Sequence, residues 1–293
     1  MIMNNAYSKV AVKQGTPEWL ELRQSKFTAS NTAVIVDLHP YKTRLEYFEE
    51  KVLGKEKPVT GPHIERGHII ETHGRQLVSA DFGIDLNPAV VVSNRIPDFM
   101  ASLDGFNEEE KINFEAKYVG AEVYDQIFNR QIPVHHRWQI QGQLAATGAD
   151  SCIYYVEDSK GRKLSQIITP DNEYIDQIVA GVEAFMKLVK SGEAPEPGDR
   201  DYVIVDNDPE LQLMRQLKDK IDLASKEYDA LKKQVETKYS DVNRLKGGGM
   251  MMYRSMVKSP IPYSKIPEVM ALDLEKHRPK PRFQTTFKKA EIV

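Results

Sequence analysis

Residues 101–117 constrain this chain more than any other stretch, because two strand-like segments flank a polar turn and carry three charged residues. Asp104 ends the first segment, and Glu115 and Lys117 lie in the second. Side chains alternate along a strand, so Glu115 and Lys117 project from one face. If the two segments pair, Asp104 lies beside them. The sequence therefore predicts a β-hairpin that brings two carboxylates and one ammonium together.

This set of groups suits the hydrolysis of phosphodiesters. Two carboxylates offer the hard oxygen ligands that Mg²⁺ prefers, and the metal and the lysine together offset the charge of the phosphorane. Glu-x-Lys alone is a weak signal, since the pair is common on solvated strand faces. The alternative is a charged hairpin with a structural role only. The apolar neighbours Ile112, Phe114 and Ala116 favour the nuclease centre.

Composition bounds the class of protein. The chain has 293 residues, of which 41% are hydrophobic, so it can bury the core of one large domain with or without an appendage. Its single cysteine, Cys152, excludes an internal disulfide framework and a cysteine-based zinc site. No secretory signal or membrane-spanning apolar run is found, so we expect a cytoplasmic protein. The net charge of −3 does not indicate nucleic-acid binding, but DNA binding depends on the local electrostatic potential and not on the net charge.

Periodicity and capping signals predict an α/β order of elements over the first two thirds of the chain. Helices are expected over residues 18–24, 43–53, 64–82, 123–128, 134–147 and 172–190. Strands are expected over residues 89–93, 98–103, 112–118, 151–157 and 163–169. Ser30 or Thr28 is expected to cap a further short helix.

A linker over residues 191–199 separates this part from a C-terminal extension, so we expect a core of residues 1–195 and an extension of residues 196–293. Asp208 and Pro209 start a long helix in the extension. The apolar positions of this helix repeat every three or four residues, at Met214, Leu217, Ile221, Ala224, Tyr228, Leu231 and Val235. This heptad pattern predicts packing along a partner helix, preferably as an intramolecular helical hairpin, or onto the core.

The glycines at 247–249 are expected to end that helix. Beyond it we expect a short β-hairpin, built from residues 250–254 and 263–266, and a basic tail over residues 276–289. Two interpretations of the tail remain open: a solvated segment, or a contact with the DNA backbone or a partner.

Four blocks of sequence occur in a recognisable order between about residues 13 and 190. They are residues 15–23 with 28–30, residues 66–71, residues 103–105 with 115–117, and residues 138–141. In these blocks the chain resembles the YqaJ/lambda-exonuclease family of the PD-(D/E)XK nucleases. The resemblance implies an α/β restriction-endonuclease-like core, a central mixed sheet flanked by helices. Leu103 stands where the family has proline, a position that shapes a turn and carries no chemistry.

The resemblance also implies the roles of the residues around the charged hairpin. Asp104, Glu115 and the Ala116 carbonyl would bind the metal, with Glu71 assisting, and Lys117 would position the attacking water. The ordinary alternative for Glu71 is an exposed helical glutamate.

Three further residues receive roles from the resemblance. Gln139 would orient the catalytic set, although buried glutamines often only satisfy backbone groups. Arg23 and Ser30 would form a pocket for a 5′-terminal phosphate, because the planar guanidinium fits a phosphate bidentately. Gln141 would contribute to substrate binding. The adjacent residues His135 and His136 are not expected to form a zinc pair, since neighbours on a helix point about 100° apart.

By the same resemblance we expect a Mg²⁺-dependent DNA exonuclease, with Mn²⁺ able to substitute. It would digest linear double-stranded DNA with 5′-phosphate ends from 5′ to 3′, leaving 3′ single strands for recombination by single-strand annealing. The family further implies a ring-shaped homotrimer, a single-strand annealing protein as partner, and a phage or prophage gene in a bacterial host.

Two alternatives remain open. One is a structure-specific or general DNA endonuclease on the same core, which would also cut closed circular DNA. The other is a non-catalytic DNA-binding adaptor, which has no need to hold three costly charges together.

Overall fold

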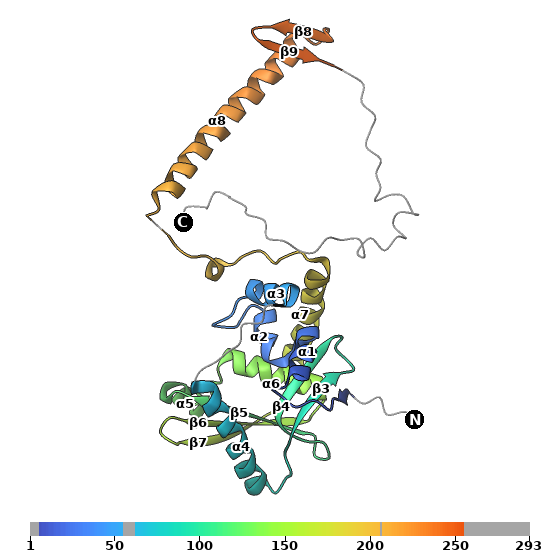
Figure 1. Ribbon diagram of the computed structural model, residues 1–293, viewed down its shortest axis with the longest axis vertical. Helices are drawn as coiled ribbons and strands as arrows, with labels where there is room; N and C mark the ends of the chain where they lie inside the picture. Colours follow the sequence, from blue (N-terminus) through green and yellow to red (C-terminus); the bar gives the residue numbers. More distant parts are fainter. Residues whose placement is uncertain (1–5, 55–61, 206, 255–293) are drawn as a thin grey trace, which may run out of the picture. The chain divides into compact units, whose positions relative to one another are not determined.

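The computed structural model describes residues 6–54, 62–205 and 207–254 (Figure 1). The chain divides into two compact units, Met1–Tyr202 and Val203–Val293. Residues beyond the expected boundary at 195 still contact the first unit, because the Arg200 guanidinium donates to the His39 carbonyl at 2.6 Å.

The first unit contains a seven-stranded mixed sheet with helices beside it. Its strands are β1 (Tyr7–Lys9), β2 (Phe27–Thr28), β3 (Asn87–Ser93), β4 (Phe99–Asn107), β5 (Ile112–Val119), β6 (Ser151–Asp158) and β7 (Lys163–Ile168). Its α-helices are α1 (Pro17–Ser25), α2 (Thr32–Ile35), α3 (Arg44–Leu53), α4 (Pro62–Phe82), α5 (Ala121–Phe128), α6 (Val134–Thr147) and α7 (Asn172–Ser191). Short 3-10 helices are η1 (Ala29–Asn31) and η2 (Asp199–Asp201).

The order of strands is β1-β3-β4-β5-β6-β7, and β2 pairs with β4. The β3-β4-β5 meander is antiparallel, whereas β5 and β6 run parallel over eight residue pairs, from Ile112–Ser151 to Val119–Asp158. Parallel neighbours need a crossover connection, which α5 and α6 provide. This mixed sheet flanked by helices confirms the fold class expected from the sequence.

Strand alternation divides the core into two layers. Phe114 and Tyr155 face the layer that α4 covers, and Cys152 and Tyr154 face the larger layer that α6 and α7 cover. Glycine allows both helices to approach closely: a Cβ at Gly74 of α4 would lie 2.6 Å from the Tyr155 ring. A Cβ at Gly142 of α6 would lie 2.8 Å from a methyl group of Thr32. Each helix is therefore held tightly against its neighbours.

Most of the expected helices and strands are present, and their ends follow the expected signals. Thr43 forms a capping box with Glu46 at the start of α3, and Gly83 follows α4 with a φ of +66°. The expected cap at Ser30 or Thr28 is wrong. Ser30 lies inside η1, and the side chain of Thr28 makes no capping hydrogen bond there.

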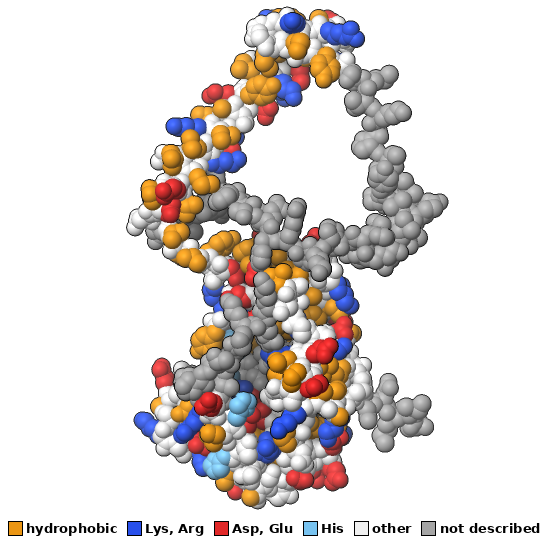
Figure 2. Space-filling view, viewed as in Figure 1, with side chains coloured by type: hydrophobic (Ala, Val, Ile, Leu, Met, Phe, Trp, Pro, Cys, Tyr) orange, Lys and Arg blue, Asp and Glu red, His pale blue; other side chains and the backbone are white. Residues whose placement is uncertain are grey.

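The second unit contains a long helix and a hairpin. Helix α8 (Pro209–Lys238) is capped by Asp208, whose side chain accepts from the Leu211 backbone N–H at 2.9 Å. None of its residues is buried, and hydrophobic side chains follow it among charged ones (Figure 2). The described part of this unit contains no second helix, so the expected helical hairpin does not form there.

The glycine run does not end α8. The helix ends at Lys238, and residues 244–253 form a hairpin of β8 (Arg244–Gly247) and β9 (Met250–Tyr253). Gly248 and Gly249 have φ angles of +57° and +76°, which a two-residue hairpin turn requires. Residues 263–266 and the basic tail at 276–289 lie outside the described residues. No described helix has the length and apolar character needed to cross a bilayer.

We predict that residues 1–202 fold without the second unit. Every buried hydrophobic side chain in the described part of the chain lies between Phe27 and Phe185, so the core of the fragment is complete. The fragment should be soluble, with a thermal midpoint within about 3 °C of the full chain, which corresponds to ~1 kcal/mol in a domain of this size. Insoluble protein, or a much lower midpoint, would show instead that the apolar positions of α8 cover the core.

Candidate active site

The β4–β5 ladder opens where the charged residues lie. Paired positions run from Asn107–Ile112 to Gly105–Phe114 and stop there. The Asp104 side chain enters the opening and accepts a hydrogen bond from the Ala116 backbone N–H at 2.9 Å. Asp104 therefore lies inside β4 rather than at its end, and its carboxylate joins the two strands beyond the last ladder pair.

Glu115 is the most enclosed charge of this group, with 2% of its surface exposed. One carboxylate oxygen forms an ion pair with the Lys117 ammonium and accepts from the Gln139 amide at 2.5 Å. The other oxygen accepts from the Gln143 amide at 2.6 Å. A buried carboxylate needs such partners, because an unpaired charge in the interior is costly.

Gln143 is a site residue that the sequence interpretation missed. Gln139 and Gln143 are four residues apart on α6, so both point from one face toward β5. Gln141 points elsewhere: its buried amide donates to the Thr169 carbonyl at 2.9 Å and accepts from the Asp171 N–H at 2.9 Å. Gln141 links α6 to the start of α7 and does not contact the carboxylates. The four-residue spacing was the signal that could have identified Gln143.

The electrostatics of the cluster favour the arrival of a cation. Burial, followed by the charges of Glu115 and Glu71, raises the pKa of Asp104 well above its usual value. Burial opposes the charge on Lys117, but Glu115 and Asp104 outweigh burial and raise the Lys117 pKa. Lys117 therefore remains an ammonium ion at neutral pH, while like charges disfavour the ionised form of Asp104.

The donor groups fit a hard divalent metal ion. Asp104, Glu115 and the Ala116 carbonyl supply only oxygen, the ligand type that Mg²⁺ prefers. As the side chains stand, no three Asp, Glu, His or Cys residues in the described part of the chain converge closely enough to enclose a metal. Mg²⁺ commonly keeps several waters or phosphate oxygens, so two carboxylates are a sufficient protein contribution.

Glu71 lies on α4, on the opposite side of the hairpin from α6. Its charge reaches both Asp104 and Lys117, while its carboxylate contacts the His68 ring at 3.3 Å. On the same helix the Arg75 guanidinium donates to the Asp104 carbonyl at 2.6 Å, which fixes α4 to the open end of the ladder. The structure thus places Glu71 within electrostatic reach of the cluster but in no direct bond with it.

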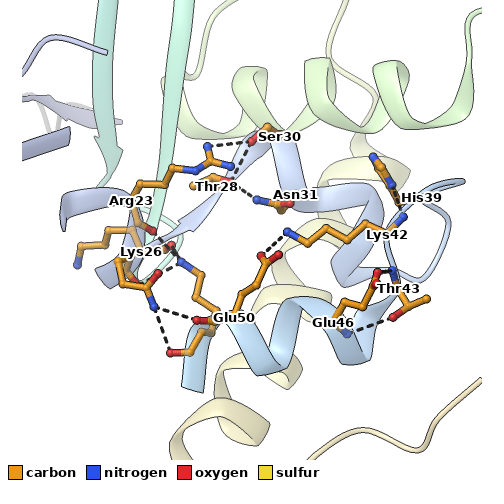
Figure 3. A network of polar contacts seen from close by, with 12 residues as sticks. Arg23, Lys26, Thr28, Ser30, Asn31, His39, Lys42, Thr43, Glu46 and Glu50 are labelled. Atoms are coloured by element: carbon orange, nitrogen blue, oxygen red, sulfur yellow. Dashed lines mark hydrogen bonds and ion pairs between the residues drawn. The ribbon is translucent and has the colours of Figure 1, made fainter. Parts of the chain in front are cut away.

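The structure brings Arg23 and Ser30 together: the Arg23 guanidinium donates to the Ser30 hydroxyl at 3.4 Å, a contact drawn in Figure 3. The same guanidinium lies 5.3 Å from the centre of the Trp19 ring. The Trp19 indole donates at 2.8 Å to the hydroxyl of Ser102, two residues before Asp104. Helix α1 is therefore anchored to β4, and the Arg23–Ser30 pair belongs to the same end of the sheet as the cluster.

Comparisons with known proteins agree with this architecture. Residues 18–150 match the family model of the YqaJ-like viral recombinase domain. The alkaline exonuclease LHK-Exo from Laribacter hongkongensis shares 23% sequence identity and a TM-score of 0.54, covering 60% of this chain and 94% of that one. The structure of LHK-Exo in complex with dAMP gives the same values. The curated proteins yielded no match.

At this level of identity the structural likeness shows the fold, and the family match confirms the resemblance. All five residues of the charged cluster and its glutamines lie within the matched segment: Asp104, Glu115, Lys117, Gln139 and Gln143. Residues 18–150 are therefore similar to the YqaJ-like viral recombinase domain, and the chain has a nuclease-like α/β fold.

Proposed function

We propose that this chain is a Mg²⁺-dependent DNA exonuclease. The observation that carries the proposal is the enclosed Glu115 carboxylate, held between the Lys117 ammonium and two glutamine amides beside Asp104. A structural hairpin does not need two buried acids whose charges repel each other. The match to a viral recombinase domain supports DNA as the substrate.

Each residue of the cluster would have its own role in phosphodiester hydrolysis. Asp104, Glu115 and the Ala116 carbonyl would hold the metal, with Glu71 assisting. When bound, Mg²⁺ supplies charge that stabilises the transition state and activates water. Lys117 positions the attacking water and offsets the negative charge that develops on the phosphate. Gln139, together with Gln143, holds the Glu115 carboxylate in one orientation, so that this ligand does not rotate.

The finer features of the activity are also proposals. Arg23 and Ser30 would bind a 5′-terminal phosphate, which supports digestion of linear duplex from 5′ to 3′. A homotrimeric ring, a single-strand annealing partner and a cytoplasmic site of action in a phage-infected bacterium follow from the family resemblance alone. We do not propose that Gln141 contacts DNA, because its amide is buried and engaged by backbone groups.

The central test compares three substrates with purified protein and Mg²⁺: linear duplex with 5′-phosphate ends, the same duplex with 5′-hydroxyl ends, and closed circular DNA. We expect rapid digestion of the first, slower digestion of the second and none of the third. Chelation of the metal should stop the reaction. Cutting of the circle would favour the endonuclease alternative, and binding without any cutting would favour the adaptor.

Replacing Lys117 tests the catalytic assignment. Lys117→Met keeps most of the side-chain volume but removes the ammonium, so the rate on phosphorylated duplex should fall about a hundredfold or more. DNA binding, measured by fluorescence anisotropy with Ca²⁺ in place of Mg²⁺, should persist. Near-normal turnover by this variant would exclude Lys117 from the reaction.

Replacing Asp104 tests the metal site through stability as well as activity. Because the pKa of Asp104 is raised in the folded state, its ionised form is disfavoured there. Asp104→Asn should therefore raise the metal-free thermal midpoint at neutral pH. This gain should shrink as the pH falls through the raised pKa, since wild-type Asp104 then becomes protonated and equally neutral.

Magnesium should stabilise the wild-type protein and not the Asp104→Asn variant. It should raise the midpoint of the wild-type protein, because it binds the folded state and relieves the repulsion between carboxylates. It should leave the midpoint of Asp104→Asn unchanged, and the variant should be inactive. An equal Mg²⁺-induced shift in both proteins would place the metal elsewhere.

Replacing Arg23 tests recognition of the DNA end. A terminal phosphate monoester carries close to two charges, so a guanidinium should favour it over an internal diester. Arg23→Ala should slow digestion of phosphorylated ends while sparing hydroxyl ends, with the larger loss at low salt. The Mg²⁺-induced thermal shift serves as the control and should stay at the wild-type value. An unchanged ratio of the two rates would assign Arg23 a role in packing only.

A further inference from the structure

Four aromatic rings that the proposed chemistry does not use meet beside the first turn of α6. His39 and Tyr41 come from the segment between α2 and α3, and His135 and His136 from α6. The His135 ring centre lies 5.4 Å from that of His39, 5.9 Å from that of Tyr41 and 4.3 Å from that of His136. All three contacts are edge-to-face, an arrangement that aromatic pairs favour.

This ring cluster, made of His39, Tyr41, His135 and His136, lies next to the charged cluster. The His136 ring nitrogen Nδ1 is 2.7 Å from the Tyr154 hydroxyl, and Tyr154 pairs directly with Glu115 in the β5–β6 ladder. Burial lowers the pKa of both His135 and His136, and the charge of Lys117 lowers each further. The inner end of the ring cluster therefore contacts the side chain that neighbours Glu115 on the adjacent strand.

The outer end of the ring cluster is open to solvent but fixed in place. Tyr41 is 83% exposed, far more than a side chain that serves packing. Its backbone is held, because His39 Nδ1 accepts from the Tyr41 and Lys42 N–H groups at 3.2 and 3.0 Å. Figure 3 shows His39 beside Lys42, and Arg200 binds the His39 carbonyl at 2.6 Å. The rings are thus presented on a segment that is already ordered.

The imidazoles are neutral at neutral pH. Burial and the charges of His135, Lys42 and Arg200 lower the pKa of His39 to about 4. Burial, with the charge of Lys117, lowers the pKa of His135. Within the described residues these histidines do not form a metal site. The cations nearest to the rings, Lys42, Arg200 and Lys117, each form an ion pair with a carboxylate. What the ring cluster itself offers is neutral aromatic surface, on which proteins stack the bases of single-stranded nucleic acid.

We propose that Tyr41, His39 and His135 form a stacking platform for an unpaired nucleobase of the DNA strand bound at the Asp104–Glu115–Lys117 cluster. This inference rests on the proposed function, since it takes DNA to be the substrate. Stacking tolerates any sequence, because every base has a π face. The platform would hold a frayed nucleotide near the scissile phosphate and so fix the position of the backbone relative to Lys117.

A double-mutant cycle between protein and DNA tests the platform directly. The probe is a short 5′-phosphorylated single-stranded oligonucleotide, and its affinity is measured with Ca²⁺ in place of Mg²⁺. A single abasic nucleotide is moved along the first positions of this oligonucleotide. At one position the wild-type protein should lose about tenfold in affinity, which corresponds to ~1.4 kcal/mol of stacking. Tyr41→Ala should bind the intact oligonucleotide about tenfold more weakly and lose nothing further at that position.

Two variants control this measurement. Tyr41→Phe keeps the ring and should retain wild-type affinity and the same abasic position. Phe128→Ala removes an aromatic ring on α5 that is 64% exposed, and it should change neither the affinity nor the abasic position. Additive losses from Tyr41→Ala and the abasic nucleotide, or unchanged binding by Tyr41→Ala, would refute the platform. If the wild-type protein cuts linear DNA in the central assay, such a result overturns the platform alone; protein that neither binds nor cuts DNA overturns the proposed function.

Discussion

The hydrogen bond from the Ala116 N–H to the Asp104 carboxylate is the contact on which the proposed active site depends. Where the β4–β5 ladder stops, this bond replaces a ladder partner and keeps the two strands together. It also holds an acid beside Glu115, where burial and the charges of Glu115 and Glu71 raise the Asp104 pKa, although the bond itself acts to lower it. The same bond that joins the strands therefore places two repelling carboxylates side by side. A fold that needed only stability would place an apolar residue there, because buried charges cost more than they return.

The surrounding helices stabilise this arrangement by hydrogen bonds. From one side α6 supplies Gln139 and Gln143 to the two oxygens of Glu115, and from the other side α4 supplies Arg75 to the Asp104 carbonyl. Both helices make close contacts at glycine, Gly74 of α4 against Tyr155 of the sheet and Gly142 of α6 against Thr32 of α2. Packing in two separate hydrophobic layers thus fixes the polar groups between them, as precise positioning of a catalytic site requires.

Local patterns in the sequence determined much of this organisation. The charged hairpin, the long helices and the two-residue spacing of Glu115 and Lys117 were predictable, because strand alternation, helix periodicity and capping depend on neighbouring residues. The ordered blocks also indicated the nuclease-like fold and the family. The same reasoning was wrong at the glycine run after α8. Gly248 and Gly249 form the turn of the β8–β9 hairpin instead of ending the helix, and local propensity fits both outcomes equally well.

The tertiary structure decided which residues of one helix face the site and which distant segments meet. Four-residue spacing groups Gln139 with Gln143, but only the packing of α6 on β5 shows that this face, and not that of Gln141, meets Glu115. The contact between His39 and His135 joins segments far apart in the chain, and no periodicity encodes it. Sequence patterns therefore determined the helices, the strands and the charged hairpin, because these depend on neighbours along the chain. The surroundings of that hairpin come from burial and close packing between distant segments, which exist only once the chain has folded.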